Sequence, residues 1–322
     1  MSAILEVKSL RKIYGNDAGV TEVNMSVEEG TIHGFLGLNG SGKTTTMKCL
    51  LGLLRIDAGA IYFQGRQVDP TAVSYKSRTG FSPELPSFPP YLTGLEVMQL
   101  YGRMRGLSGS RRNSESRDLL RRVGLDGAEN KRVGKYSRGM QAKLGVAVSL
   151  INEPDLLILD EPTSGMDPGG AAIIRDILRE TVRDGSTVLL SSHLLFEVQS
   201  ICRNITIINR GRTLREGTVK DLIQGSGNTT VYIAEFNSIS DALLRSVEGL
   251  GGVSGCTVSD PGRIRVEVTG DTDIRESVAR IAMNHGSLML SCIKQEMSLE
   301  ELFLELVSED TAGRTTQSTT NS

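Results

Sequence analysis

The sequence of 322 residues lacks the long apolar stretch that a membrane-spanning helix needs. It has no run of about 18 apolar residues, and acidic Glu6 stands where a secretory signal peptide would be apolar. We therefore expect the chain to stay in the cytosol. Its 4 cysteines lie far apart without any C-x-x-C pairing, which predicts reduced thiols and neither a zinc site nor a disulfide framework.

The chain also has little net charge. Lysine and arginine number 36 against 38 aspartates and glutamates, so the net charge of −2 gives no electrostatic case for binding nucleic acid. An apolar share of 39% and a charged share of 23% are typical of a globular protein with a sizeable core. A length of 322 residues predicts about two domains, and no long repeat or heptad pattern is visible.

What the sequence does contain is a glycine-rich stretch from Gly37 to Thr44. It reads GLNGSGKT and fits the pattern G-x-x-x-x-G-K-S/T, which cradles nucleotide phosphates. A predicted buried strand over 31–36 precedes it and a predicted helix over 45–54 follows it. The glycines let successive N–H groups turn toward one point, where the helix dipole favours negative charge. Lys43 is expected to reach the β and γ phosphates; the alternative is a glycine-rich surface turn.

A second polar feature follows a short apolar run. Residues 156–159 read LLIL, typical of a strand buried on both faces of a parallel sheet, and they end in Asp160 and Glu161. A carboxylate pair at the carboxyl end of such a strand lies on the ligand-binding edge of an open α/β sheet. A later predicted strand over 187–191, followed by His193, continues the β/α alternation. Taken alone, an Asp-Glu pair is more often part of a loop or a cap.

Composition and pattern divide the chain into three parts. Residues 1–225 alternate strands and helices as a nucleotide-binding domain, in which a proline-rich loop opens a helical subdomain of about residues 84–150. After linker-like residues 224–229, residues 226–308 are predicted to follow a β-α-β-β-α-β order, that of a ferredoxin-like split βαβ fold. Residues 309–322 lack apolar content and are expected to be disordered.

Taken in order, the motifs resemble those of the ATP-binding cassette (ABC) ATPases over roughly residues 4–225. GLNGSGKT corresponds to the Walker A motif, and LLILDEP at 156–162 to Walker B with the catalytic glutamate. YSRGMQ at 136–141 stands where the family has its signature, SGMD at 164–167 matches the D-loop, and His193 matches the switch histidine. The resemblance implies an α/β P-loop NTPase: a RecA-like core with an antiparallel β subdomain and a helical subdomain, plus a small C-terminal α+β domain.

The resemblance assigns the hydrolytic chemistry to three residues. Hydrolysis of the γ phosphate needs an oriented water and charge neutralisation, because the protein mainly positions an in-line transfer. Glu161 is then the general base that polarises the water, and Lys43 neutralises phosphate charge. His193 is expected to contact the γ phosphate, although a lone histidine is more often structural.

The same resemblance makes ATP the bound nucleotide and places Mg²⁺ at Thr44, Asp160 and Glu84. Asp160 is suited to hold the metal through its water shell, and Glu84 is expected to be a metal-side ligand. Glu84 departs from the family, because most members carry the glutamine of the Q-loop there. Arg138 stands where the LSGGQ signature has its first glycine. The resemblance implies that both departures affect the coupling of ATP hydrolysis to the partner more than they affect nucleotide binding.

The other expected contacts belong to the base and to a second nucleotide. Tyr14 matches the aromatic that stacks on adenine, although alone it is an ordinary half-buried aromatic. Ser137 and Gly139 open a helix, so their N–H groups and the serine hydroxyl suit a γ phosphate, which in the family belongs to the other subunit. Dimerisation is then part of the active site. The expected nucleotide contacts are Tyr14, Gly37, Asn39, Gly40, Ser41, Gly42, Lys43, Thr44, Thr45, Ser137 and Gly139.

The resemblance implies the ATPase subunit of a membrane transporter, similar to multidrug, antibiotic-resistance and sodium-efflux exporters; SLEELFLEL at 298–306 also looks like that subfamily. Its expected partners are a separate integral-membrane permease and a second cassette, without nucleic acid, at the inner face of the cell membrane. The alternative is a soluble ABC ATPase acting on ribosomes or DNA, which would carry two cassettes or a coiled-coil insertion. The signature motif argues against a metabolic P-loop kinase. The substrate is not encoded here, because the permease would bind it.

Overall fold

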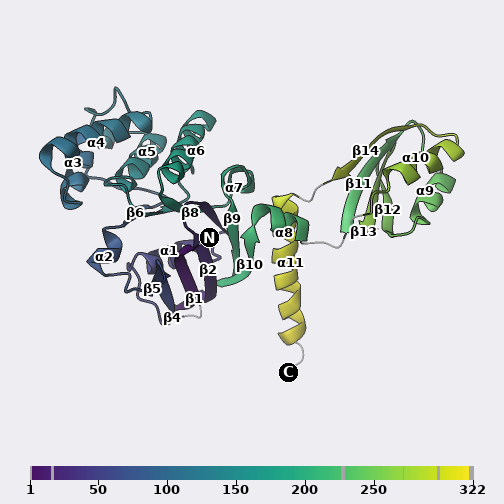
Figure 1. The fold of residues 1–322 in the computed structure, drawn as a ribbon, viewed down its shortest axis with the longest axis horizontal. Helices are drawn as coiled ribbons and strands as arrows, with labels where there is room; N and C mark the ends of the chain where they lie inside the picture. The colour runs from purple at the N-terminus through teal and green to yellow at the C-terminus, as the bar shows by residue number, and fades with distance from the viewer. Residues whose placement is uncertain (1, 16–17, 226–228, 271, 296–297, 319–322) are drawn as a thin grey trace. The chain divides into compact units, whose positions relative to one another are not determined.

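The computed structural model describes residues 2–15, 18–225, 229–270, 272–295 and 298–318 (Figure 1). The chain forms two compact units. The first comprises Met1–Val219 with Leu306–Ser322, and the second comprises Lys220–Glu305. The boundary expected at 225 and the linker over 224–229 stay predictions, because residues 226–228 lie outside the described part of the chain.

The first unit is built on one mixed sheet of ten strands. They are β1 (Ala3–Ile13), β2 (Gly19–Glu28), β3 (Ile32–Leu36), β4 (Ala58–Phe63), β5 (Arg66–Gln67), β6 (Thr79–Ser82), β7 (Leu156–Asp160), β8 (Thr187–Ser192), β9 (Asn204–Asn209) and β10 (Arg212–Thr218). Their order is β5-β4-β1-β2-β10-β9-β3-β8-β7-β6. Strands β5, β4, β1 and β2 pair antiparallel, while β9, β3, β8, β7 and β6 pair parallel. This confirms the predicted P-loop α/β fold with an antiparallel β portion.

The parallel strands bring their carboxyl ends to one edge of the sheet. In the register of the sheet, Leu36 on β3 faces Ser192 on β8, and Ser191 on β8 faces Asp160 on β7. Every residue of β3, β7 and β8 is buried, which explains their nearly continuous apolar sequences. The segments that follow these strands therefore begin side by side at the edge where α/β proteins bind ligands.

Some helices of the first unit pack on the sheet, and others form a cluster of their own (Figure 1). They are α1 (Lys43–Leu50), α2 (Val73–Lys76), α3 (Gly94–Met104), α4 (Gly109–Arg122), α5 (Arg138–Ser149), α6 (Pro168–Arg183) and α7 (Leu195–Ile201), with a 3₁₀ turn at Val133–Lys135. Helices α3, α4 and α5 pack together as a helical subdomain. A Cβ on Gly145 of α5 would lie 2.5 Å from Pro86 Cγ, so this helix lies tightly against the proline-rich loop.

The second unit is an antiparallel sheet with two helices on one face (Figure 1). After α8 (Val219–Gly225), its elements are β11 (Thr229–Phe236), α9 (Asp241–Glu248), β12 (Val253–Asp260), β13 (Arg263–Thr269), α10 (Arg275–Asn284) and β14 (Met289–Gln295). The strand order is β12-β13-β11-β14. Tyr232 and Phe236 of β11 are buried in a core with Val247 of α9 and Val278 of α10. The elements follow a β-α-β-β-α-β order.

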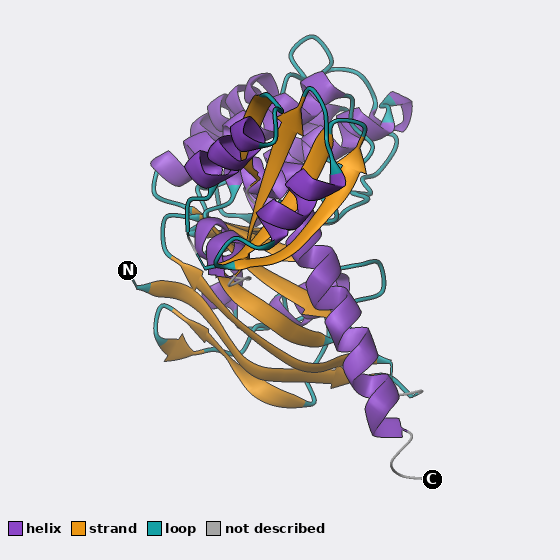
Figure 2. Ribbon diagram, turned by 90° about the vertical axis from the view of Figure 1, so that its right-hand side faces the viewer, coloured by secondary structure: helices purple, strands orange, loops and turns teal. Residues whose placement is uncertain are grey.

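The chain closes with one continuous helix, α11 (Leu299–Ser318), shown in Figure 2 as the long helix that leads to the C-terminus. The sequence predicts a disordered tail from residue 309, whereas the structure continues the helix to Ser318; residues 319–322 lie outside the described part. A polar anchor supplies the reason. Asp310 is 7% exposed, its Oδ2 accepts a hydrogen bond from Asn209 Nδ2 at 2.9 Å, and it pairs with Arg212. Low apolar content gives no sign of such an anchor.

Candidate nucleotide-binding site

The glycine-rich stretch forms a tight loop between β3 and α1. Gly42, which precedes the first residue of α1, has φ 108°, in the left-handed region where only glycine is unstrained. A Cβ on Gly37 would lie 2.3 Å from Ser41 Oγ and 2.6 Å from the Ile208 carbonyl oxygen. Ser41 Oγ is buried without a hydrogen-bond partner. A phosphate oxygen would satisfy this hydroxyl, so the loop fits the group that its sequence predicts.

Lys43 lies at the centre of this loop and is 5% exposed. Its Nζ donates hydrogen bonds to the carbonyl oxygens of Gly37 at 2.8 Å and Leu38 at 3.3 Å. It also lies 3.9 Å from Glu161 Oε1. Burial lowers the pKa of the Lys43 ammonium, and nearby carboxylates, Glu161 foremost, oppose that shift. A buried ammonium within this glycine-rich loop is suited to a polyphosphate.

Asp160 is the last residue of β7 and is 4% exposed. Its Oδ2 accepts a hydrogen bond from Thr44 Oγ1 at 2.9 Å, and its Oδ1 accepts one from Ser191 Oγ at 2.6 Å. Ser191 is not among the residues that the motifs predict, although a small hydroxyl residue at the carboxyl end of a predicted parallel strand is a usable signal. Both oxygens of this buried carboxylate are held by neutral hydroxyl groups.

Glu161 follows in a sharp turn, with φ 47° in the left-handed region. A non-glycine residue there costs about 1–2 kcal/mol, and such strain gathers at functional sites. The Glu161 N–H donates to Ser191 Oγ at 3.0 Å. Its Oε2 lies 2.8 Å from His193 Nδ1. The turn thus aims the carboxylate at the histidine that follows β8 rather than back into the sheet.

These contacts join five of the expected site residues through Ser191: Lys43, Thr44, Asp160, Glu161 and His193. Asn39 and Gly40 are exposed on the loop, and Thr45 lies in the first turn of α1. The described residues contain no group of three or more histidine, cysteine, aspartate or glutamate side chains that could hold a metal. A single buried carboxylate beside a hydroxyl, Asp160 with Thr44, fits Mg²⁺ by its donor chemistry, because this ion uses one or two carboxylates and keeps several waters.

The signature residues lie outside this connected set. Ser137 caps α5, where its Oγ accepts a hydrogen bond from Met140 N at 3.2 Å, and Gly139 lies in the first turn of the helix. A Cβ on Gly139 would have Met166 Cγ at 3.9 Å, so the start of α5 lies beside the D-loop of the same chain. Within the described residues, no hydrogen bond or ion pair joins Ser137 or Gly139 to Lys43.

Tyr14 and Glu84 lie at the margins of the site. Tyr14 is 42% exposed, and its N–H donates to Ala18 O at 2.8 Å; Gly19 and Val20, just beyond, lie against Gly42. Its ring is therefore on a segment beside the phosphate loop. Glu84 is exposed in the loop after β6, and its charge is one of those that raise the pKa of Lys43 against the effect of burial.

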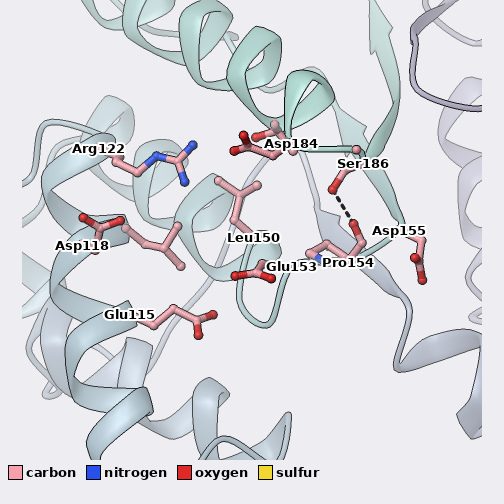
Figure 3. A pocket seen from close by; sticks show the side chains of 12 residues that line it. Glu115, Asp118, Arg122, Leu150, Glu153, Pro154, Asp155, Asp184 and Ser186 are labelled. Carbon is pink, nitrogen blue, oxygen red and sulfur yellow. Dashed lines mark hydrogen bonds between the residues drawn. The ribbon is translucent and has the colours of Figure 1, made fainter.

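A cavity of about 470 Å³ lies elsewhere, at the opposite edge of the sheet (Figure 3). It opens among α4, the turn before β7 and the turn before β8, where Ser186 Oγ donates to Pro154 O at 2.7 Å. Several carboxylates that line it already have arginine partners: Asp155 lies 2.6 Å from Arg78 Nε, Glu115 lies 3.3 Å from Arg111 Nε, and Asp118 pairs with Arg121. This cavity is distinct from the phosphate loop.

Comparison with known proteins agrees with the geometry. The ABC transporter family profile matches residues 20–164. The chain is 32% identical over 316 residues to a Nod factor export ATP-binding protein I of Cupriavidus metallidurans, across 96% of this chain and 99% of that protein. It is 33% identical over 313 residues to a daunorubicin resistance ATP-binding protein of Streptomyces coeruleorubidus, across 95% and 96%. A solved ATP-binding subunit of an ABC transporter superposes with a TM-score of 0.64 at 30% identity, covering 69% of this chain and 93% of that one. The chain therefore belongs to the ATP-binding proteins of ABC transporters and is an ABC transporter ATPase.

Proposed function

We propose that this ATPase drives export through a separate membrane permease and that Glu161 is its general base. The observation that carries the catalytic assignment is the strained turn at Glu161, which sets its carboxylate 2.8 Å from His193 Nδ1 and 3.9 Å from Lys43 Nζ. A half-buried base beside a phosphate loop is the arrangement that orients a water for in-line attack. His193 holds the carboxylate in place and is suited to donate a hydrogen bond toward the γ phosphate.

The remaining polar groups divide the work of binding. Lys43, which donates to the carbonyl oxygens of Gly37 and Leu38, would exchange these partners for phosphate oxygens. Thr44 and Asp160 are the groups that would hold Mg²⁺, which supplies charge neutralisation at the phosphates when bound. Glu84 stays a proposed metal-side ligand. Tyr14, with an exposed ring beside the loop, is the proposed stacking partner of adenine.

Two copies are proposed to complete each site. Ser137 and Gly139 present N–H groups at the start of a 12-residue helix, which favours an anionic ligand. Among the described residues no hydrogen bond joins them to Lys43 of their own chain, and the nucleotide that they contact is proposed to be the one held by the partner cassette. Nucleotide binding and dimerisation then become a single event.

The proposed permease contact lies in the helical subdomain. Leu85 and Met104 are each 73% exposed, Tyr91 is 69% exposed and Leu100 is 42% exposed, which gives this part of the chain large apolar groups without cover. Such groups mark a protein interface. No helix of the described residues is long and apolar enough to cross a membrane, so the partner would provide the path. The names of the relatives, which concern Nod factor export and daunorubicin resistance, support export over a role at ribosomes or DNA.

A pair of methionine variants tests this assignment. The tagged chain is purified from detergent-solubilised membranes of its own host, and the bound membrane protein is identified and assayed for stimulation of ATP turnover. Met104→Glu, which puts a charge on an exposed apolar site, is expected to lose most of that membrane protein and its stimulation while keeping basal turnover. Met283→Glu in α10 is the matched control, because Met283 is 74% exposed against 73% for Met104. Equal recovery with both variants would contradict the proposed contact.

A further inference from the structure

Glu197 is a buried carboxylate close to the catalytic edge that the motifs do not include. It lies in the first turn of α7, just beyond His193, and is 6% exposed. Its Oε2 accepts a hydrogen bond from Thr163 Oγ1 at 2.6 Å, and its Oε1 accepts one from Arg175 Nη1 at 3.3 Å. Both oxygens are therefore occupied, as a buried carboxylate requires.

Each partner of Glu197 belongs to a segment that begins at the catalytic edge. Thr163 lies in the turn that follows Glu161, which is closed by Ser164 N donating to Glu161 O at 3.0 Å and by Met166 N donating to Thr163 O at 3.2 Å. Because this turn is so short, a shift of Thr163 must also move Glu161. The Thr163 hydroxyl is the group through which Glu197 holds it.

The other side of the contact belongs to the switch histidine. His193 is followed at once by α7, and Leu194 N donates to Ser192 Oγ at 2.9 Å, which fixes the entry to the helix. Arg175 of α6 balances the charge of Glu197 at 3.3 Å and anchors α7 against the neighbouring helix. The contacts of Glu197 therefore hold the start of α7, and with it the segment that carries His193, in one position.

We propose that Glu197 is a positioning residue for ATP hydrolysis. Through Thr163 it ties the segment after Glu161 to the segment after His193, and so maintains the 2.8 Å contact between Glu161 Oε2 and His193 Nδ1. Glu197 itself touches neither of these two side chains by any bond recorded among the described residues. The proposal rests on the roles proposed above for Glu161 and His193.

The sharpest test removes one hydroxyl at each of two matched sites. Thr163→Val is expected to lower kcat for MgATP about 10-fold, because sub-ångström misplacement of a catalytic group is costly, while KM and the binding of a fluorescent ATP analogue change less than about twofold. Thr181→Val in α6 is the control: Thr181 is 5% exposed and its Oγ1 donates to Ile177 O at 2.8 Å, so this change also removes one side-chain hydrogen bond but leaves Glu197 untouched. The control is expected to keep its kcat. Thermal unfolding of both proteins is followed to set an assay temperature at which both are folded.

Glu197 variants supply the second arm. Glu197→Gln keeps the size and one oxygen acceptor, so it is expected to retain more turnover than Glu197→Ala. The double variant Thr163→Val with Glu197→Gln is expected to lose no more than the stronger single change, because both act through one contact. Strictly additive losses would overturn the proposal.

Two further outcomes distinguish the positioning role of Glu197 from the proposed role of Glu161 as general base. If Thr163→Val keeps full kcat, or loses no more than Thr181→Val, while Glu161→Gln is inactive, the positioning role of Glu197 is refuted and the catalytic site stands. If Glu161→Gln itself turns over like the unmodified protein, the assignment of the base fails, and the positioning role fails with it.

Discussion

An aspartate stands at each end of strand β7, Asp155 just before it and Asp160 as its last residue, and the two side chains have different partners. At the amino end, Asp155 forms an ion pair with Arg78, at 2.6 Å. At the carboxyl end, Asp160 is held by the hydroxyls of Thr44 at 2.9 Å and Ser191 at 2.6 Å. An arginine partner neutralises a carboxylate and occupies its oxygens, whereas a hydroxyl fixes its orientation and leaves its negative charge in place.

Glutamates at the two edges of the sheet differ in the same way as the two aspartates. At the amino edge, Glu115 lies 3.3 Å from Arg111 Nε. At the carboxyl edge, Glu161 meets His193 at 2.8 Å and the distant ammonium of Lys43 at 3.9 Å, and no arginine of the described residues pairs with it. The two edges of the sheet thus differ in the partners of their carboxylates: arginines at the amino edge, and hydroxyls, a histidine and a lysine at the carboxyl edge. The comparison can be tested from both ends.

The largest expected effect is at Glu161. Glu161→Gln keeps the shape of the side chain but cannot accept a proton from water, so ATP turnover is expected to fall about 10³-fold, within the range for loss of a general base. Nucleotide binding, followed with a fluorescent ATP analogue, should persist, and an ATP-dependent dimer should accumulate. If Glu161→Gln turned over ATP almost as fast as the unmodified enzyme, the carboxylates at the carboxyl edge of the sheet would have no catalytic role that sets them apart from those at the amino edge.

Asp155, just before β7, and Asp160, its last residue, give a pair with a smaller effect. Asp160→Asn is expected to raise the Mg²⁺ concentration needed for half-maximal turnover about 10-fold or more, because a metal-holding charge is lost. Asp155→Asn should leave the Mg²⁺ requirement unchanged and cost at most about 1 kcal/mol of unfolding free energy, as for other exposed ion pairs. Titrations of turnover against Mg²⁺, with urea denaturation alongside, measure both. A shared shift in Mg²⁺ requirement would show that the ends of β7 are equivalent.

The smallest expected effect compares two serines at the two ends of β8. Ser191→Ala frees Asp160 Oδ1 and the Glu161 N–H, so turnover is expected to fall several-fold, up to about 10-fold. Ser186→Ala also removes one hydrogen bond, to Pro154 O at 2.7 Å, and is expected to cost about 1 kcal/mol of stability without changing turnover. Steady-state ATPase rates below the unfolding transition distinguish the two. Equal turnover in both variants would show that Ser191 has no part in orienting the carboxylates.

Local sequence was enough to predict the parts of the site that lie within one motif. The spacing of Gly37 and Lys43 predicts a phosphate loop at the turn found between β3 and α1, and the apolar run before Asp160 placed the carboxylates at a strand end. The α/β alternation and the β-α-β-β-α-β order of the C-terminal elements followed from the pattern of apolar residues in the same way. These features depend on neighbours in the chain, which a single sequence displays directly.

The missed features all depend on pairing between distant segments. Ser191 reaches Asp160 only because β8 lies beside β7 in one particular register, and a shift by one residue would turn its hydroxyl away. Glu197 meets Thr163 across 34 positions of sequence. The helix beyond residue 308 likewise holds a buried aspartate, Asp310, for which composition predicted only disorder.

Asp310 also sets an order of events during synthesis of the chain. Its partner Asn209 is buried and lies 101 positions earlier, and the whole segment Lys220–Glu305 is made between them. At a synthesis rate of about 5–20 residues per second, roughly 5–20 seconds pass between the synthesis of Asn209 and that of Asp310. Domains fold as units from the amino end, so the second unit can complete its sheet while the turn between β9 and β10 still lacks Asp310. That turn, whose Gly211 N–H donates to the carbonyl oxygen of Ser41 at 2.8 Å, is complete only once Asp310 has been made.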